Sequence, residues 1–449
     1  MLEELADGET SAERIVRAAI ERAQDLGGDL HAFVSVIVEP AIAAARGFDA
    51  RRRNGERLPV LAGVPWAVKD VVDVAGCVTR AGSRTTEARA PAAADAAVVA
   101  EIADLGAVLV GKTSTNELAY GGPSRDVDFP MALNPAGRDR FTGGSSSGSA
   151  AAVAAGIVPF AIGTDTGGSV RGPAAWTGCI GVKPTIGALP SSGVMALAGS
   201  LDHVGFLTRT VDDADVVWSA LCGEPPQRPL GPTLAGFRIG FLSGDWVGAD
   251  ADQAVRGAVD HAAHVVDALD AELVDVEMPD FAEFAAVGRV LIMAEAWETH
   301  AATMRHHPER FGEATRGRLL LGATITAADK ALASRSRRHL ATATCAAFEH
   351  VDVIVTPTAV AEPPLLADVV TPRPRSEPPC EPFSLIGSTS PMRTIPFNLT
   401  GHPAVSVPAG RTESNLPVGL QVVGRPWGER DALRVARAIE YHGGEVLDV

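Results

Sequence analysis

The chain has few cysteines and no long apolar run, and each shortage excludes a class of protein. The five cysteines are odd in number and form no CxxC pair, so we expect neither a disulfide framework nor a thiolate zinc site. No uncharged apolar run reaches about 18 residues without turn residues, which argues against a transmembrane helix. The N-terminus begins acidic and amphipathic, unlike a signal peptide. Together these absences predict a cytoplasmic protein.

Basic residues are also fewer than acidic residues. The chain has 39 Lys and Arg against 55 Asp and Glu, a formal net charge of -16 at pH 7. Such an acidic surface repels phosphate groups, so we expect neither nucleic acid nor a membrane as a partner. Hydrophobic residues make up 46% of the 449 residues and charged residues 21%, a composition typical of a globular protein with a large core.

Strand and helix patterns alternate along the first part of the chain. Apolar runs at 61–74 and 157–162 indicate buried strands, residues 97–104 favour a helix, and 107–110 a short strand. A helix over residues 10–26 is expected to begin at a capping box. This alternation predicts an α/β fold whose sheet is at least partly parallel.

The second half of the chain has a different composition and pattern of apolar residues. A Pro-rich connection at 223–232 leads to a mostly helical stretch at 281–350. Residues 361–391 carry many prolines and little periodicity, which is typical of a lid or a pocket wall. Strands at 404–407 and 420–423, and a helix at 429–441, then return the chain to α/β character.

Two turns rich in glycine and hydroxyl groups are the densest feature of the sequence. They lie in FTGGSSSGS and GTDTGGSVR and are separated by an apolar segment, so we expect their hydroxyls to be held against a core. Backbone N–H groups in such a turn can converge on one point and form an oxyanion hole. Ser169, at the end of the second turn, would then lie beside a developing negative charge.

Lys69 is the candidate base. Its neighbours in GVPWAVKD are nearly all apolar, and burial lowers the pKa of an amine so that it can accept a proton near neutral pH. From this strand alone, a lysine paired with Asp70 or reaching solvent is the commoner arrangement. The other motifs in the chain decide between these readings.

Two further motif matches favour other chemistry but have the wrong context. Residues 106–113, GAVLVGKT, match the P-loop pattern, yet the four central residues favour a strand over a phosphate-binding loop. Residues 144–148, GSSSG, match the nucleophile elbow of α/β hydrolases, but DRFTG before them is not the apolar strand that this elbow requires. An ATP-binding protein is therefore a weaker hypothesis than a serine hydrolase.

Taken together, the segments around Lys69, Ser145 and Ser169 resemble the amidase signature family. Their order matches the family pattern, and the two serines lie 24 positions apart (145 to 169), as that pattern requires. Four further segments also resemble this family, at 111–121, 200–213, 396–410 and 416–431. The resemblance therefore covers nearly the whole chain.

The resemblance implies a Ser-cisSer-Lys triad, with Ser169 as nucleophile, Ser145 as bridging serine after a cis peptide bond, and Lys69 as base. It places the oxyanion donors on the backbone N–H groups of Thr166, Gly167, Gly168 and Ser169. It gives bracing roles to Ser146, Asp165 and Arg171. The implied activity is hydrolysis of amide, anilide or carbamate C–N bonds in a small molecule, with esters as further substrates, and it needs no metal or organic cofactor.

The resemblance also implies one α/β domain over 1–449, with a large twisted mixed sheet flanked by helices on both faces, and a homodimer. Within it we expect a helical N-terminal segment, a catalytic core, a helical and Pro-rich insertion that shapes the pocket, and a C-terminal return to the sheet, at 1–60, 61–215, 281–395 and 396–449.

The pocket walls are expected at 120–131, 281–350 and 361–391. Four apolar side chains could face the pocket, although packing is the commoner role for each: Trp66, Met131, Phe383 and Leu385. Two alternatives to a stand-alone amidase remain. One is the amidase component of a glutamyl-tRNA amidotransferase, and the other a non-catalytic module on the same scaffold.

Overall fold

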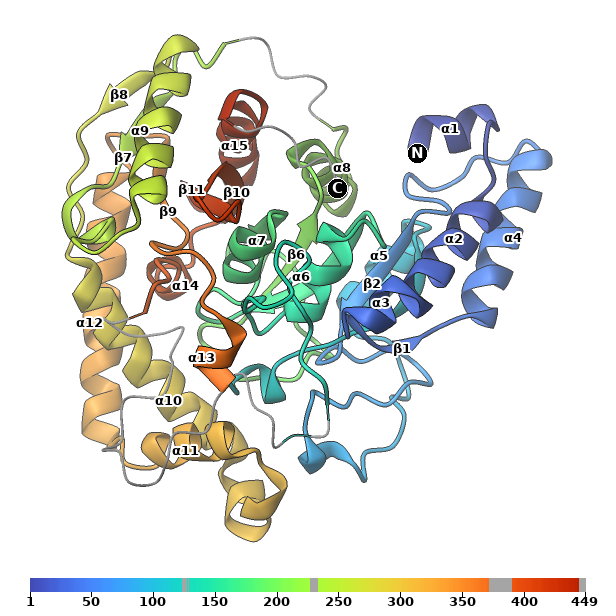
Figure 1. Cartoon of the computed structure of the whole chain (residues 1–449), viewed down its shortest axis with the longest axis horizontal. Coiled ribbons are helices and arrows are strands. Elements are labelled where there is room, and N and C mark those ends of the chain that lie inside the picture. The colour runs from blue at the N-terminus through green and yellow to red at the C-terminus, as the bar shows by residue number, and fades with distance from the viewer. Residues whose placement is uncertain (123–126, 128, 227–232, 371–389, 444–449) are drawn as a thin grey trace.

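A single mixed sheet runs through the computed structural model, which describes residues 1–122, 127, 129–226, 233–370 and 390–443. Within this part of the chain the sheet has 11 strands, in the order β1-β3-β2-β4-β6-β5-β10-β11-β9-β7-β8 (Figure 1). The strands are β1 (Phe33–Val36), β2 (Pro65–Lys69), β3 (Val108–Thr113), β4 (Phe160–Asp165), β5 (Ile180–Lys183), β6 (His203–Thr208), β7 (Arg238–Phe241), β8 (Glu272–Val274), β9 (Val353–Pro357), β10 (Ala404–Arg411) and β11 (Pro417–Gly424).

The strand directions confirm a mixed sheet. β2 is parallel to β3 and to β4, and β9, β7 and β8 form a second parallel set. Between these sets, β4, β6, β5, β10, β11 and β9 pair antiparallel. The two C-terminal strands therefore lie in the middle of the sheet, beside strands that come from the first half of the chain.

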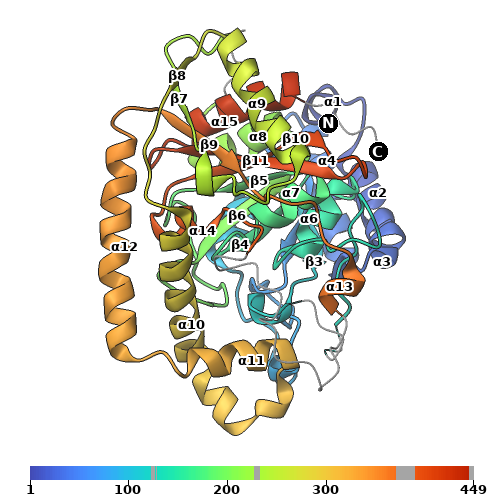
Figure 2. The same ribbon diagram turned by 60° about the vertical axis from the view of Figure 1, so that its left-hand side comes forward.

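Helices cover both faces of this sheet (Figures 1 and 2). α7 packs on β10 and β11, and α9 and α15 contact the same strands from the other face. The helices are α1 (Leu2–Asp7), α2 (Ala12–Gln24), α3 (Leu26–Asp29), α4 (Glu39–Arg53), α5 (Ala97–Asp104), α6 (Ser147–Ala154), α7 (Arg171–Thr177), α8 (Val211–Cys222), α9 (Gln253–Ala268), α10 (Phe281–His306), α11 (Glu313–Gly322), α12 (Ala327–Ala347), α13 (Leu366–Val370), α14 (Ile395–Leu399) and α15 (Glu429–Gly443).

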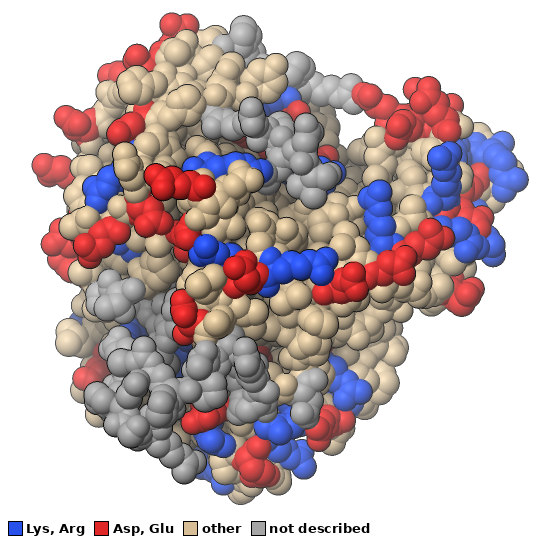
Figure 3. Space-filling model, in the orientation of Figure 1, with Lys and Arg blue, Asp and Glu red and all other residues tan. Residues whose placement is uncertain are grey.

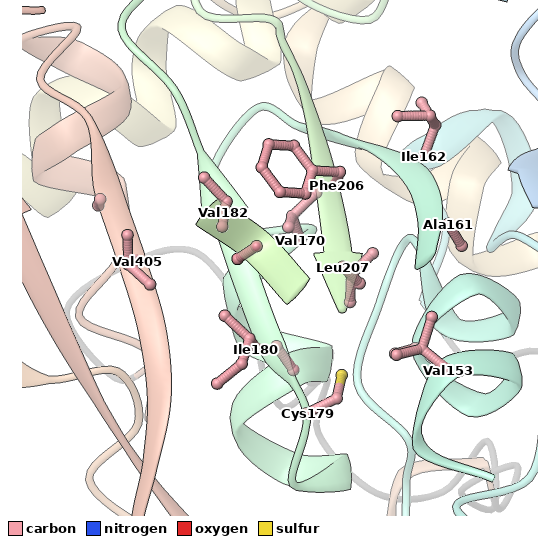
Figure 4. Packing of buried hydrophobic residues seen from close by; sticks show 14 of the residues in the cluster. Val153, Ala161, Ile162, Val170, Cys179, Ile180, Val182, Phe206, Leu207 and Val405 are labelled. Atoms are coloured by element: carbon pink, nitrogen blue, oxygen red, sulfur yellow. The ribbon is translucent and has the colours of Figure 1, made fainter. Parts of the chain in front are cut away.

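The centre of the core lies between β4, β5, β6 and the small-residue helix α6. Figure 4 draws Val153, Ile162, Val170, Phe206 and Leu207 among the buried residues of this core. Phe206 and Leu207 follow each other in β6 and therefore point to opposite faces of the sheet. Ala150, Ala151 and Ala152 of α6 are fully buried, and their small size lets this helix lie close against β4. A rigid apolar layer of this kind fixes the two turns that follow β4 and precede α6.

Several local predictions need correction. The helix predicted over 10–26 begins at Ser11, whose side chain accepts a hydrogen bond from the Arg14 N–H, so Thr10 is not the cap. The segment 1–60 also contributes β1, and 281–395 contributes β9, so neither is purely helical. The predicted wall at 361–391 lies largely outside the described residues, and Phe383 and Leu385 fall there.

The surface view agrees with the mixed composition. On the face shown in Figure 3, acidic and basic side chains are interspersed. Within the described ranges, none of the helices is both long and apolar enough to cross a membrane. The same ranges contain no group of three or more His, Cys, Asp or Glu residues arranged to hold a metal ion.

Candidate active site

Lys69 is the last residue of β2 and is completely buried between β3 and β4. Its Nζ lies 2.7 Å from Ser145 Oγ and 2.8 Å from Thr164 Oγ1. Among the described residues it forms no ion pair. Burial lowers the pKa of Lys69 to about 7, against the opposing charges of Asp165 and Asp202. An amine that has hydroxyl neighbours and no counter-ion in contact can therefore be neutral near pH 7.

Ser145 lies just before α6, after a cis peptide bond with Gly144. Its side chain is buried, and its carbonyl accepts a hydrogen bond from the Asn116 N–H. A Cβ on Gly144 would lie 2.5 Å from Asn116 Nδ2, so only glycine fits at this approach. The peptide on each side of Ser145 is thus held, and its hydroxyl is directed toward Lys69.

Ser169 lies in the turn between β4 and α7, and its side chain is partly exposed, unlike those of Lys69 and Ser145. The Ser146 N–H donates to the Ser169 carbonyl at 3.1 Å, which fastens the two turns together. Ser145 and Ser169 line the same pocket. Among the described contacts there is no hydrogen bond between their hydroxyls, so a proton relay requires a small side-chain rotation. Such bonds commonly tighten only when substrate binds.

The turn from Thr166 to Ser169 presents free backbone donors. Within the described part of the chain, the N–H groups of Gly167 and Ser169 have no protein acceptor. The Gly168 N–H, by contrast, donates to Asp165 Oδ1 at 2.8 Å. Gly168 has φ +127°, and a Cβ there would collide with Thr394 Oγ1, so this position requires glycine.

Asp165 and Arg171 form a buried ion pair beneath the turn, with Arg171 Nη2 2.9 Å from Asp165 Oδ1. Burial raises the pKa of Asp165, but the charge and hydrogen bonds of Arg171 outweigh it and hold the pKa well below its usual range. The carboxylate accepts from the Gly168 and Val170 N–H groups. It therefore shapes the turn that carries Ser169.

The C-terminal part of the chain braces the same turn from behind. Thr394 Oγ1 donates to the Gly167 carbonyl at 2.6 Å. Asn398 Nδ2 donates to Asp165 Oδ1 at 2.7 Å. Arg171 reaches further and donates to Gln421 Oε1 on β11. Residues more than two hundred positions away in sequence thus hold the nucleophile turn in place.

A pocket that opens to solvent lies over this site. Its walls combine the two glycine-rich turns with residues of α10 and α11 and the segment around Tyr120. The lining residues are Asn116, Ala119, Tyr120, Gly121, Gly144, Ser145, Thr166, Gly167, Gly168, Ser169, Gly172, Leu197, Arg289, Ile292, Met293, Arg318, Leu321 and Met392.

Comparison with known proteins identifies the family. The amidase family model matches residues 14–433. The chain belongs to the amidase signature family. It is therefore an enzyme, a hydrolase of amide-type C–N bonds.

Relatives within the amidase signature family differ in their activities. The chain is 33% identical over 457 residues to AtzE, a 1-carboxybiuret hydrolase subunit of Pseudomonas sp. (strain ADP), covering 99% of this chain and 98% of that one. It is 36% identical over 471 residues to a glutamyl-tRNA(Gln) amidotransferase subunit of Anaeromyxobacter sp. (strain K), covering 96% and 92%.

A solved structure extends the similarity to three dimensions. The structure is that of a vestigial protein complex which reveals the evolutionary origins of an s-triazine catabolic enzyme. One of its chains superposes with a TM-score of 0.88 at 33% identity, over 98% of this chain and 97% of that one. This match and the family model agree on one continuous amidase signature fold.

Other predicted pocket residues have packing roles. Trp66 is buried and stacks on Phe160, with ring centroids 5.8 Å apart. Met131 packs against the small cluster that contains Phe141 and Trp176. Neither lines the pocket over Ser169.

Residues 106–113, which match the P-loop pattern, do not fold as a phosphate-binding loop. Residues 108–113 form β3. Lys112 is buried, and its Nζ lies 2.7 Å from Asp70 Oδ1. The ammonium group of Lys112, which in a P-loop would contact phosphate, is therefore already paired with Asp70 inside the protein.

Sequence reasoning missed three residues of the candidate site, namely Thr164, Thr394 and Asn398. Thr164 directly precedes Asp165 in GTDTGGS, so its position in the motif was a usable signal. Asn398 lies in the familial segment 396–410, but only the fold shows that it reaches Asp165. Nothing in the local sequence of Thr394 indicates its contact with Gly167.

Proposed function

We propose that the chain hydrolyses linear amide-type bonds of small molecules (amides, anilides or carbamates) through an acyl-enzyme on Ser169. The observation that carries this proposal is the buried Lys69, which contacts the Ser145 hydroxyl and no carboxylate. A lysine in this state has a lone pair available at neutral pH. The relative named for 1-carboxybiuret hydrolysis gives independent support for cleavage of C–N bonds in small molecules.

The proposed relay runs from Ser169 to Lys69. Neutral Lys69 takes the proton of Ser145, and the Ser145 oxygen takes the proton of Ser169. The Ser169 oxygen forms a bond to the carbonyl carbon, whose π electrons move to oxygen. When the tetrahedral intermediate collapses, the C–N bond breaks and the nitrogen receives the proton through Ser145. Water then attacks the acyl-enzyme by the same relay.

The oxyanion of the intermediate is proposed to bind in the turn before Ser169. Gly167 and Ser169 offer N–H groups without protein acceptors, and Thr166 lies in the same turn. One such donor contributes about 3 kcal/mol to transition-state stabilisation. Because the Gly168 N–H already bonds to Asp165, we assign Gly168 to holding the shape of the turn. Ser146 has the same role through its bond to the Ser169 carbonyl.

The decisive experiment is acylation of Ser169. The purified chain should react with a fluorophosphonate probe, and peptide mapping should place the label on Ser169. Ser169→Ala should abolish both labelling and turnover in a panel of nitroanilides, aryl carbamates and primary amides. Labelling of another serine, or turnover by S169A, would refute the assignment.

A second candidate function is that of the amidase component of a glutamyl-tRNA amidotransferase. The 36% identity to a protein of this kind favours it, whereas the net charge of -16 disfavours contact with tRNA. The two functions separate in one assay. Hydrolysis of simple amides by the isolated chain, without ATP, tRNA or a partner, supports the stand-alone enzyme.

A further inference from the structure

Asp202 directly precedes β6, at the point where this strand lies beside the end of β4. The antiparallel register pairs Asp165, the last residue of β4, with His203, the first residue of β6. One step further along, Thr166 lies opposite Asp202, and Thr166 Oγ1 donates to Asp202 Oδ1 at 2.6 Å. This length is typical of a hydroxyl bonded to a carboxylate. The sheet therefore brings the Asp202 carboxylate to the turn that carries Ser169.

The same carboxylate holds one wall of the pocket. Asp202 Oδ2 accepts from the backbone N–H groups of Leu197 and Ala198, at 2.9 Å and 3.1 Å. Leu197 and Thr166 both line the pocket over Ser169. Because an ionised carboxylate only accepts hydrogen bonds, the hydroxyl proton of Thr166 and the two N–H groups all point toward it. Asp202 thus joins the nucleophile turn to the pocket wall at Leu197.

The loop that contains Leu197 is held on its other side by α10. Glu295 of this helix accepts from the Ser200 N–H at 3.0 Å and from Ser200 Oγ at 2.7 Å. Thr299, one helical turn later, donates to the Leu197 carbonyl at 3.3 Å. Glu295 and Asp202 are therefore two carboxylates that fix one loop, and only Asp202 also binds the nucleophile turn.

The charge of Asp202 also acts on Lys69. Burial has the largest effect on the pKa of Lys69 and lowers it, while the charges of Asp165 and Asp202 oppose this shift. Asp165 is paired with the cation of Arg171. In the described part of the chain, Asp202 bonds to a hydroxyl and to N–H groups and to no cation. Its negative charge is therefore not offset by a partner.

Two further titratable groups of the surrounding strands are paired or neutral. Lys112 of β3 is paired with Asp70. Burial lowers the pKa of His203 well below its usual range, so this imidazole stays neutral. The contacts of Lys69 Nζ itself are hydroxyl groups. Removal of the Asp202 charge should therefore change the protonation of Lys69 without breaking an ion pair.

Building on the hydrolysis proposed above, we propose that Asp202 is a positioning residue for the reaction at Ser169. It fixes the Thr166 hydroxyl, and through it the turn that binds the oxyanion, and it fixes the pocket wall at Leu197. Its negative charge favours the ammonium form of Lys69 and so raises the pH at which this base becomes available. Asp202 is not among the described residues that line the pocket, so it acts through these groups.

The test is steady-state kinetics on the best substrate of the panel, over about pH 5 to 9. Asp202→Asn should lower kcat about tenfold, because its amide nitrogen cannot accept and either the Thr166 hydroxyl or the loop N–H groups lose their acceptor. The midpoint of its kcat/KM profile should lie about half a pH unit or more below that of the native enzyme. Glu295→Gln, the matched control on the same loop, should leave the midpoint unchanged.

Thr166→Val separates the two effects of Asp202. It removes the hydroxyl and keeps the carboxylate, so kcat should fall about as far as in D202N while the midpoint stays at the native pH. Thr166→Ser keeps the hydroxyl and should retain most of the native kcat. The double variant T166V/D202N should lose no more than about threefold in kcat beyond D202N, because both changes break the same link.

The outcomes distinguish this inference from the hydrolysis proposal. A native kcat or a native midpoint in D202N would overturn the positioning role while Ser169 still reacts with the fluorophosphonate probe. Losses in T166V and D202N that multiply in the double variant would overturn it as well. If D202N does not fold, equal kcat in T166V and T166S has the same consequence. A native chain without acylation at Ser169 would refute the hydrolysis proposal and, with it, this role.

Discussion

Lys69 is the last residue of β2 and Lys112 the penultimate residue of the neighbouring parallel strand β3. Both are buried, yet their surroundings differ in one respect. Lys112 lies against the Asp70 carboxylate, with a hydroxyl of Thr79 2.9 Å away. Lys69 has hydroxyl partners only, Ser145 and Thr164. The register pairs Val68, not Lys69, with Lys112, so the two amines project to opposite faces of the sheet.

The difference teaches that burial alone does not assign a role to a lysine. A counter-ion favours the ammonium form and makes the pair structural, whereas hydroxyl partners leave desolvation to dominate and lower the pKa. The burial of Asp70 raises its own pKa, and the charge of Lys112 opposes that rise. The same residue type thus has a carboxylate partner near the end of one strand and only hydroxyl partners at the end of the next.

The largest expected effect comes from Lys69→Met, which keeps the shape of the side chain and removes its basicity. We expect kcat to fall at least a thousandfold at pH 7, because Ser145 then has no group to take its proton. Steady-state kinetics on the best substrate of the panel measures this. Retention of most activity would remove Lys69 from the relay.

Activity should also follow the titration of Lys69. The pKa of Lys69 in the folded protein is about 7, below the usual 10.5. The fraction of Lys69 in the ammonium form therefore rises as the pH falls below 7, and the neutral amine that acts as base is lost. We expect kcat/KM to drop about tenfold per pH unit well below the pKa, roughly fiftyfold between pH 7 and 5, and to level off above pH 8. A flat profile between about pH 6 and 9 would contradict this assignment.

The smallest effect on chemistry is expected from Lys112→Met. This change leaves Asp70 buried without its cation, so we expect a loss of about 3–5 kcal/mol in the free energy of unfolding, while kcat of the folded enzyme stays within about threefold. Denaturant titration measures the loss. The double variant Asp70→Asn, Lys112→Met should regain most of it, because both charges are then gone.

Lys69→Met serves as the matched control for that measurement. It removes a buried amine that has no ion pair, so its free energy of unfolding should change far less than that of K112M. Equal losses in the two variants would show that counter-ions do not distinguish these lysines.

Much of the fold followed from periodicity. The α/β class, the helix at 97–104 and the strands at 404–407 and 420–423 agree with α5, β10 and β11. The central position of β10 and β11 could not be predicted, since strand order depends on long-range pairing that local patterns do not encode. The cap at Ser11 was missed because Thr10 offers the same side-chain chemistry one position earlier.

The candidate site likewise has residues that sequence motifs predict and contacts that they do not. Lys69, Ser145 and Ser169 belong to recognisable motifs, and the structure brings Lys69 and Ser145 into contact. Sequence could not show that the Gly168 N–H is taken by Asp165, or that Thr394 and Asn398 support the turn. Those contacts depend on backbone positions that only the folded chain defines.

The hydrogen bonds of Arg171 join two segments that the ribosome synthesises at different times. The Arg171 guanidinium joins Asp165 to Gln421, which is translated 250 positions after Arg171 itself. A nascent chain that still lacks β11 carries Ser169 on a turn in which Arg171 contacts Asp165 but not Gln421. We therefore expect a chain that ends before β11 to lose hydrolytic activity, because Arg171 then lacks its Gln421 partner.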